Sequence, residues 1–180
     1  MRKVGLLCGI VVLSVGLGAC GGSDQTSSAP AAGASTPWGP GLGVTRDVAE
    51  AYFNNVGQPI HWPSESLLAN GTPRVFANTP AGNCIVELDG ESSNIVDVDT
   101  ICMVPLGTDQ ADLSAAGTYL YGSAYLADND SAIDTWFSSE VAKDTSATTE
   151  VDDTRVFGNT SIEFQVHGVI GSMAITAKRT

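Results

Sequence analysis

The residue types that catalyse reactions are sparse in this chain, which has four cysteines and two histidines among 180 residues. A catalytic serine or cysteine needs a neighbouring base, and the sequence contains neither a G-x-S-x-G turn nor a phosphate-binding G-x-x-x-x-G-K loop. His167 lies on the polar side of an expected strand, where a surface role is commoner than general-base catalysis. We therefore expect no catalytic residues and interpret the protein as a non-enzyme.

The second histidine belongs to an aromatic loop bounded by two prolines. Residues 59–63 read Pro-Ile-His-Trp-Pro, so His61 and Trp62 sit on a stretch of restricted backbone. One interpretation is a contact loop in which both side chains meet a partner. The other is that Trp62 closes one end of the hydrophobic core, which is the commoner fate of a loop tryptophan.

The acidic residues bear on two classes of ligand, nucleic acids and metal ions. The sequence has 20 acidic and 8 basic residues and a formal charge of −12, which repels nucleic acid. Residues 128–130 begin like a calcium loop, but Ile133 replaces the required glycine and Ser139 replaces the required glutamate. Asp97 and Asp99 share a strand face, where a weak divalent-cation site is the alternative to a solvated face. We expect no metal and no cofactor.

Two of the cysteines, Cys84 and Cys102, are placed to form a disulfide. If the chain folds back around Ser93, they face each other across a hairpin. Two further pairs then share their sheet face, Val86 with Thr100 and Leu88 with Val98. The opposite face carries four acids with isoleucines among them: Glu87, Asp89, Asp97, Asp99, Ile85, Ile95 and Ile101. The alternatives, metal ligation and a redox pair, lack a nearby histidine and a C-x-x-C motif.

The first twenty residues are typical of an export signal. Arg2 and Lys3 precede an apolar run, residues 4–19, that is short for a membrane span. The run ends in Leu-Gly-Ala-Cys at residues 17–20, which resembles the lipobox of bacterial lipoproteins. The resemblance implies that residues 1–19 are removed and that Cys20 is lipidated. The protein would then be held at the extracytoplasmic face of the cell membrane. The alternative is an ordinary secretory signal with a chance cysteine.

The domain organisation follows from composition. Residues 20–41 are rich in Gly, Ser, Ala and Pro, which predicts a flexible tether behind the lipidated cysteine. Residues 42–180 have the length and hydrophobic content of a single globular domain.

A second resemblance concerns the cysteine hairpin. Residues 76–84 and 101–103 are similar to a pattern in uncharacterised exported actinobacterial domains, in which a Pro-Ser-Gly-Asn turn precedes a strand cysteine. Ala81 stands where that pattern has serine. The pattern implies export and a disulfide, and it carries no known activity.

Hydrophobic spacing predicts the elements that position these residues. A helix capped by Thr45 would bury one face, made of Val48, Ala49, Tyr52, Phe53 and Val56. A second helix is expected over 131–142, and 110–127 favours helix over strand. Alternating residues over 156–157, 162–166 and 173–177 predict strands at the C-terminal end. The order predicts an α+β fold, with an antiparallel sheet, helices packed on one face and one disulfide.

These expectations favour a non-catalytic binding module of the cell envelope. Its partners would be the membrane, through the lipid on Cys20, and an envelope protein, glycan or small ligand, with nucleic acid excluded. A phage-exclusion or immunity-type surface lipoprotein is the first alternative. An envelope hydrolase with an arrangement hidden from sequence spacing, built on His61, is the second.

Overall fold

A seven-stranded antiparallel sheet dominates the part of the chain that the structure describes. The structure is a computed structural model, and it describes residues 34–56, 58–105, 108–128, 131–141, 150–167 and 171–180. The strands of the sheet lie in the order β3-β4-β5-β6-β9-β8-β7, and every neighbouring pair is antiparallel. Their bounds are β3 Ser66–Leu67, β4 Pro73–Asn78, β5 Cys84–Glu91, β6 Asn94–Met103, β7 Glu150–Phe157, β8 Thr160–His167 and β9 Ser172–Arg179.

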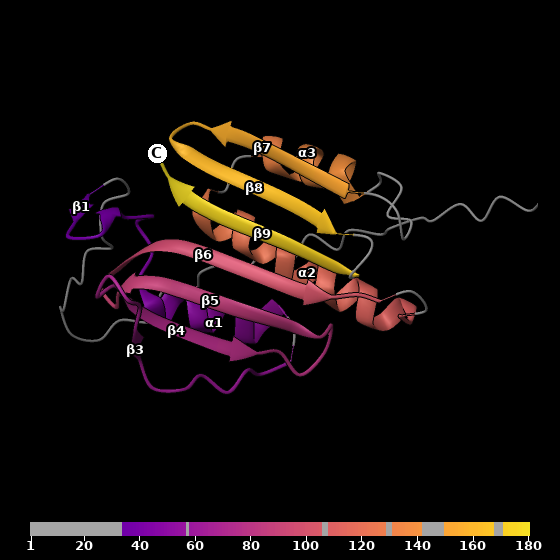
Figure 1. The fold of residues 1–180 in the computed structure, drawn as a ribbon, viewed down its shortest axis with the longest axis horizontal. Coiled ribbons are helices and arrows are strands. Elements are labelled where there is room, and N and C mark those ends of the chain that lie inside the picture. The colour runs from indigo at the N-terminus through magenta and orange to yellow at the C-terminus, as the bar shows by residue number, and fades with distance from the viewer. Residues whose placement is uncertain (1–33, 57, 106–107, 129–130, 142–149, 168–170) are drawn as a thin grey trace, which may run out of the picture.

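Three helices of the described residues cover one face of this sheet, as Figure 1 shows. They are α1 Arg46–Val56, α2 Gln110–Ala127 and α3 Ser131–Val141. The core lies between the helices and the sheet, and its largest fully buried side chains include Trp136, Tyr119, Phe53, Phe164 and Leu88. The predicted α+β fold, with helices on one face of an antiparallel sheet, is confirmed.

The predicted disulfide is present and sits in that core. Cys84 and Cys102 are bonded, with Cα atoms 3.9 Å apart, and both side chains are at most 2% exposed. The hairpin register is the predicted one over most of its length, with Cys84 opposite Cys102, Val86 opposite Thr100 and Leu88 opposite Val98. Reading a period of two from the cysteines therefore places most of β5 and β6 correctly.

The hairpin departs from the prediction at its closed end. A β-bulge between Asp89 and Gly90 shifts the register, so Gly90 pairs with Ile95. The prediction that Ile95 lies on the acidic face is wrong, because the extra residue on β6 turns this side chain into the core, where it is fully buried. Gly90 has a φ of +114°, and a Cβ there would lie 2.8 Å from the backbone nitrogen of Val96, so the bulge needs a glycine.

Helix α1 begins at the predicted cap. The Thr45 hydroxyl accepts a hydrogen bond from the backbone N–H of Val48 at 3.3 Å. The buried face is narrower than predicted, since Ala49 and Phe53 are fully buried whereas Val48 is 57% exposed. Val48 points away from the sheet because the helix rests on the stripe formed by Arg46, Ala49 and Phe53.

Residues 110–127 form helix α2, so the alternative of a strand in this region is wrong. The helix is capped by Asp109, whose side chain accepts a hydrogen bond from the backbone N–H of Asp112. Its face of small residues lies close to the sheet, where Ala116 and Ala124 are at most 1% exposed. Ser123 shares a buried 2.6 Å hydrogen bond with Thr100 of β6.

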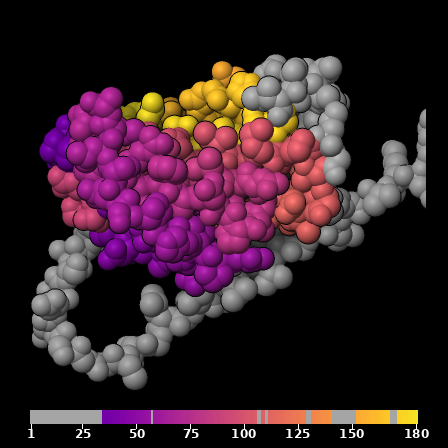
Figure 2. All heavy atoms as spheres, turned by 60° about the horizontal axis from the view of Figure 1, so that its bottom comes forward, coloured from indigo at the N-terminus to yellow at the C-terminus, as the bar shows by residue number. Residues whose placement is uncertain are grey.

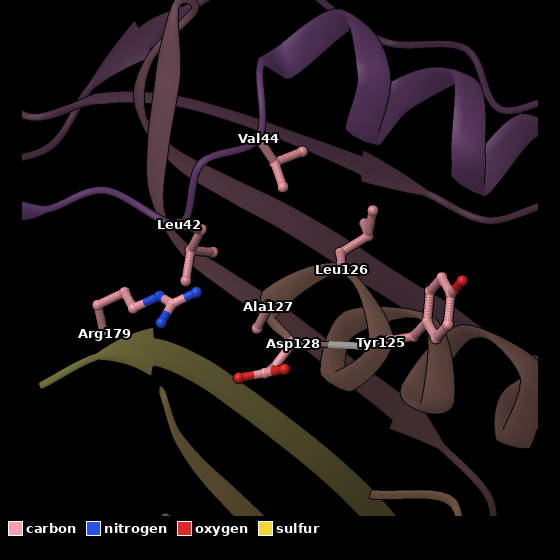
Figure 3. A pocket seen from close by; sticks show the side chains of 7 residues that line it. All are labelled: Leu42, Val44, Tyr125, Leu126, Ala127, Asp128 and Arg179. Carbon is pink, nitrogen blue, oxygen red and sulfur yellow. The ribbon is translucent and has the colours of Figure 1, made fainter. Parts of the chain in front are cut away.

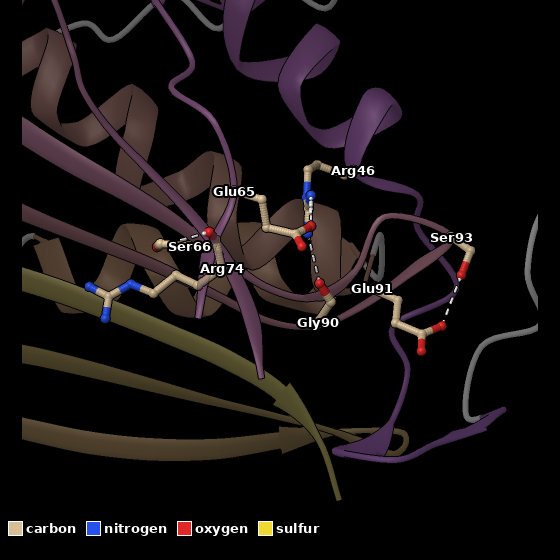
Figure 4. A network of polar contacts seen from close by, with 7 residues as sticks. All are labelled: Arg46, Glu65, Ser66, Arg74, Gly90, Glu91 and Ser93. Carbon is tan, nitrogen blue, oxygen red and sulfur yellow. Dashed lines mark hydrogen bonds and ion pairs between the residues drawn. The ribbon is translucent and has the colours of Figure 1, made fainter. Parts of the chain in front are cut away.

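Arg46 ties α1 to the hairpin and to the loop before β3. One guanidinium nitrogen contacts the carboxylate of Glu65, and the other donates to the carbonyl oxygen of Gly90 at 2.8 Å (Figure 4). The backbone N–H of Arg46 donates to the carbonyl oxygen of Ser92. Arg46 is 8% exposed, so its charge depends on these partners.

Two short strands, β1 Ser35–Thr36 and β2 Gly39–Pro40, form a small hairpin before α1. They lie within the range that composition predicts as tether. Among the described residues, no helix has the length and apolar character needed to cross a membrane.

Candidate functional site

The sheet face opposite the helices, called here the open face, carries apolar side chains that no described helix covers. Phe76 of β4, Ile85 of β5, and Ile101 and Met103 of β6 are between 41% and 48% exposed. Ile85 lies directly opposite Ile101 across the hairpin, so the four residues belong to adjacent strands. We call them the apolar patch. A contiguous apolar patch on an exposed sheet face is typical of an interaction site.

On the open face, the next two cross-strand pairs of β5 and β6 are acidic. Glu87 lies directly opposite Asp99, and Asp89 lies directly opposite Asp97. These four residues form the acidic cluster. Like charges at directly opposed positions of an antiparallel pair destabilise the sheet. The cluster therefore works against the stability of this hairpin.

The disulfide fixes the positions of the apolar patch and the acidic cluster on the open face. Ile85 and Ile101 are the chain neighbours of Cys84 and Cys102, and they point to the other face of the sheet. A slip of one residue in the pairing of β5 and β6 would exchange the two faces. Because the covalent bond holds the register, it holds the apolar patch beside the acidic cluster.

Three carboxylate oxygens of the acidic cluster have no hydrogen-bond donor among the described residues. They are the Oδ1 atoms of Asp89, Asp97 and Asp99, and each of these atoms is buried. A buried acceptor without a donor costs free energy, and more so when it carries charge. The cluster is therefore short of N–H or O–H donors.

The surroundings raise the pKa of these carboxyl groups. Burial, with the charges of Asp99 and Asp89, raises the pKa of Asp97 to about 8. Burial, with the charge of Asp89, raises the pKa of Glu87 to about 7. The pKa of Asp99 is also raised, by burial, although a hydrogen bond with Thr176 opposes the shift. Protons shared among these groups lower the repulsion at neutral pH.

Two cations stand at the edges of the acidic cluster. Arg74 of β4 forms a salt bridge with Glu87 at 2.8 Å, and its guanidinium carbon lies 5.1 Å from the centre of the Phe76 ring. Lys178 of β9 lies opposite Asp97, and its charge lowers the pKa of Asp97. Neither cation supplies a hydrogen bond to the three unpartnered Oδ1 atoms.

The sequence-predicted contact residues lie elsewhere. His61 is exposed, while Trp62 is half-buried, and its ring centre lies 6.3 Å from that of Phe53 in the core. The loop that carries them joins α1 to β3. The structure therefore does not bring His61 and Trp62 to the open face. Cys20, the predicted lipidation site, lies outside the described residues.

The described residues also contain a shallow pocket of about 280 Å³ (Figure 3). Leu42 and Val44 line it from the segment before α1, residues 125–128 from the end of α2, and Arg179 from the end of β9. Asp128 and Arg179 are its only charged lining residues. Its volume is just below the range of about 300–1,000 Å³ typical of small-molecule sites, so we do not take it as the functional site.

Metal binding by the acidic residues has no geometric support. Nowhere in the described ranges do three His, Cys, Asp or Glu side chains come together in a way that could hold a metal ion. The acidic cluster spreads along two strands instead of converging on one point.

The sequence pattern predicts the acidic cluster but only half of the apolar patch. The alternation around the cysteines placed Ile85 and Ile101 beside the acids. The same alternation does not extend to Phe76 of β4 or to Met103 at the end of β6. The alternation of Arg74, Phe76 and Asn78 with Val75 and Ala77 was the available signal.

Comparisons of the chain with protein-family models, with curated proteins and with solved structures found no match.

Proposed function

We propose that this chain is a lipid-anchored, non-catalytic binding module of the cell envelope and that it binds a partner protein through the open face. The observation that carries the proposal is the juxtaposition of the apolar patch with the acidic cluster. If this face contacted only water, four half-exposed apolar side chains beside four crowded carboxyl groups would not stabilise the folded protein.

The proposed anchor rests on the sequence. Residues 17–20 carry the lipobox-like motif, and about fourteen residues of tether before β1 would give the domain an r.m.s. reach of ~20 Å from the bilayer. Two or three acyl chains hold a soluble domain at a membrane stably. The net charge of −12 disfavours contact with anionic headgroups, which would leave the open face in water and accessible to a protein.

The open face suits a protein partner better than a small molecule. It is a surface of neighbouring strands, as Figure 1 shows, and the pocket lies elsewhere, beside the end of α2. Figure 2 shows the molecule from the side of β3 and β4, where residues of the loop before β4 and of β4 itself form much of the visible surface. An apolar centre bordered by polar side chains is the usual anatomy of a protein–protein contact.

Site-specific photocrosslinking in living cells tests this proposal. A photoreactive residue at Ile101 should capture a discrete partner, because Ile101 is 48% exposed within the apolar patch. The matched control is Val48, which is 57% exposed but lies on α1, in the helix layer. Capture from Ile101 alone supports the proposal. Equal capture from both positions, or none from Ile101, contradicts it.

The anchor has a separate test. Replacing Cys20 with alanine should move the protein from the membrane fraction to the soluble or secreted fraction. Mass spectrometry of the native protein should find diacylglycerol on Cys20. An unmodified thiol there would disprove the anchor.

A further inference from the structure

We propose that the segment that binds the open face is a cationic, amphipathic stretch of protein, with lysine or arginine side chains on the acidic cluster and apolar side chains on the apolar patch. This inference rests on the proposed function and specifies the chemistry of its partner.

The balance of charge around the acidic cluster favours a cation. The acidic cluster has four carboxyl groups, and Glu163 of β8, two strands beyond β6, lies opposite Thr176 of β9. Against these five stand two cations, Arg74 and Lys178. Complementary charge is the main source of selectivity in such contacts.

The unpartnered oxygens point to the kind of cation. The Oδ1 atoms of Asp89, Asp97 and Asp99 are buried acceptors that lack donors. Lysine and arginine side chains provide three and five N–H donors respectively, and they accept no hydrogen bonds. The Oδ1 atoms themselves are covered, but all three residues are only partly buried, so a partner side chain of this type would supply the missing charge at their remaining carboxylate surface.

The apolar patch indicates that the partner segment also has an apolar side. Ile101 and Asp97 are four residues apart on β6, which corresponds to about 13 Å along the strand. A helix covers that length with roughly nine residues. A short amphipathic helix could therefore contact both groups at once, with its apolar residues over Ile85 and Ile101.

Other occupants fit this face less well. A second copy docked face to face would place one acidic cluster against another. An anionic bilayer surface would be repelled in the same way. A divalent cation is disfavoured because the described carboxyl groups do not converge.

Binding of a cation should depend on pH. The charged groups around Asp97 come from five strands: Arg74, Glu87, Asp89, Asp99, Lys178 and Glu163. Protons held by this cluster must leave before a cation can pair with the carboxylates. Affinity should therefore rise as the pH increases from about 6 to about 8.

The test uses the full lipoprotein in nanodiscs of phosphatidylcholine, with empty nanodiscs as the reference surface. The probe is an amphipathic 18-residue peptide of leucine and lysine, and matched peptides carry glutamine or glutamate in place of lysine. The wild-type protein should bind the lysine peptide about tenfold more tightly than the glutamine peptide, and more weakly as salt is added. Equal binding of the lysine and glutamine peptides would overturn the inference.

The matched variants are Asp97→Asn with Asp99→Asn, against Asp152→Asn on β7 as the control. The double variant should bind the lysine peptide about tenfold less tightly and show a weaker dependence on pH, while the control binds like the wild type. Unchanged binding by the double variant would refute a role for the acidic cluster.

Crosslinking from Ile101 in cells that carry the double variant separates the two proposals. Reduced capture of the partner supports the inference. Capture at the wild-type yield refutes the cationic partner and leaves the binding module standing. No capture in wild-type cells means that the proposed function itself fails.

Discussion

Replacing Asp97 with asparagine should make the protein more stable at neutral and alkaline pH. In the folded state, burial and two neighbouring carboxyl groups raise the pKa of Asp97 to about 8. In the unfolded chain an aspartate titrates near 3.9. Between these values the folded state holds a proton that the unfolded state has released, so the free energy of unfolding falls as the pH rises.

The magnitude follows from the number of protons. One proton held only by the folded state lowers the free energy of unfolding by about 1.4 kcal/mol per pH unit. From pH 5 to pH 7 the wild-type protein should lose roughly 3 kcal/mol through this group. Asparagine does not titrate, so the variant should lose less over the same range. Its amide also supplies a donor for the neighbouring unpartnered oxygens of Asp89 and Asp99.

The assay is urea unfolding at pH 5, 6, 7 and 8, with Asp152→Asn as the control. Asp152 is an exposed acid on the same face, three strands away from Asp97. The wild type and the control should become less stable with rising pH, and the Asp97→Asn profile should be flatter. If the wild-type protein were as stable at pH 8 as at pH 5, the acidic cluster would not be crowded or buried as described.

Three further results are expected. Replacing Cys84 and Cys102 with alanine should lower the free energy of unfolding by about 3 kcal/mol in urea titrations, and a loss below 1 kcal/mol would contradict the role given to the disulfide. Arg46→Ala should lower the free energy of unfolding by about 2–3 kcal/mol, and Glu65→Gln should lower it clearly less, because Arg46 also donates a hydrogen bond to the hairpin backbone. Equal losses from the two variants would refute this. Trp62→Ala should lower the melting temperature in calorimetry, because the Trp62 ring packs on the core. An unchanged melting temperature would contradict this packing.

The hairpin shows how far alternation in the sequence could predict the site. Side chains on a strand alternate strictly, so the two cysteines fixed the pairing of β5 with β6 and gathered the four acids on one face. The bulge at Gly90 broke that alternation and placed Ile95 in the core. A bulge adds one residue without a strong sequence signal, so a regular pattern cannot locate it.

The remaining differences arise from tertiary packing. Val48 has the spacing of a buried residue, yet it is exposed, because α1 contacts the sheet along a narrower stripe than its apolar residues allow. The raised pKa values and the unpartnered oxygens of Asp89, Asp97 and Asp99 depend on burial by neighbouring strands. Sequence patterns predict which face an acid occupies, and they carry no information on how deeply its oxygens are buried.

Methyl NMR of the isoleucines tests the central claim most directly, because the open face and the core each carry isoleucines. Ile85 and Ile101 lie in the apolar patch, whereas Ile133 and Ile162 are at most 1% exposed in the core. On addition of detergent-solubilised cell envelope, the signals of Ile85 and Ile101 should shift or broaden more than those of Ile133 and Ile162. Unchanged signals from Ile85 and Ile101, with the protein still folded, would contradict the claim that the open face is the contact surface.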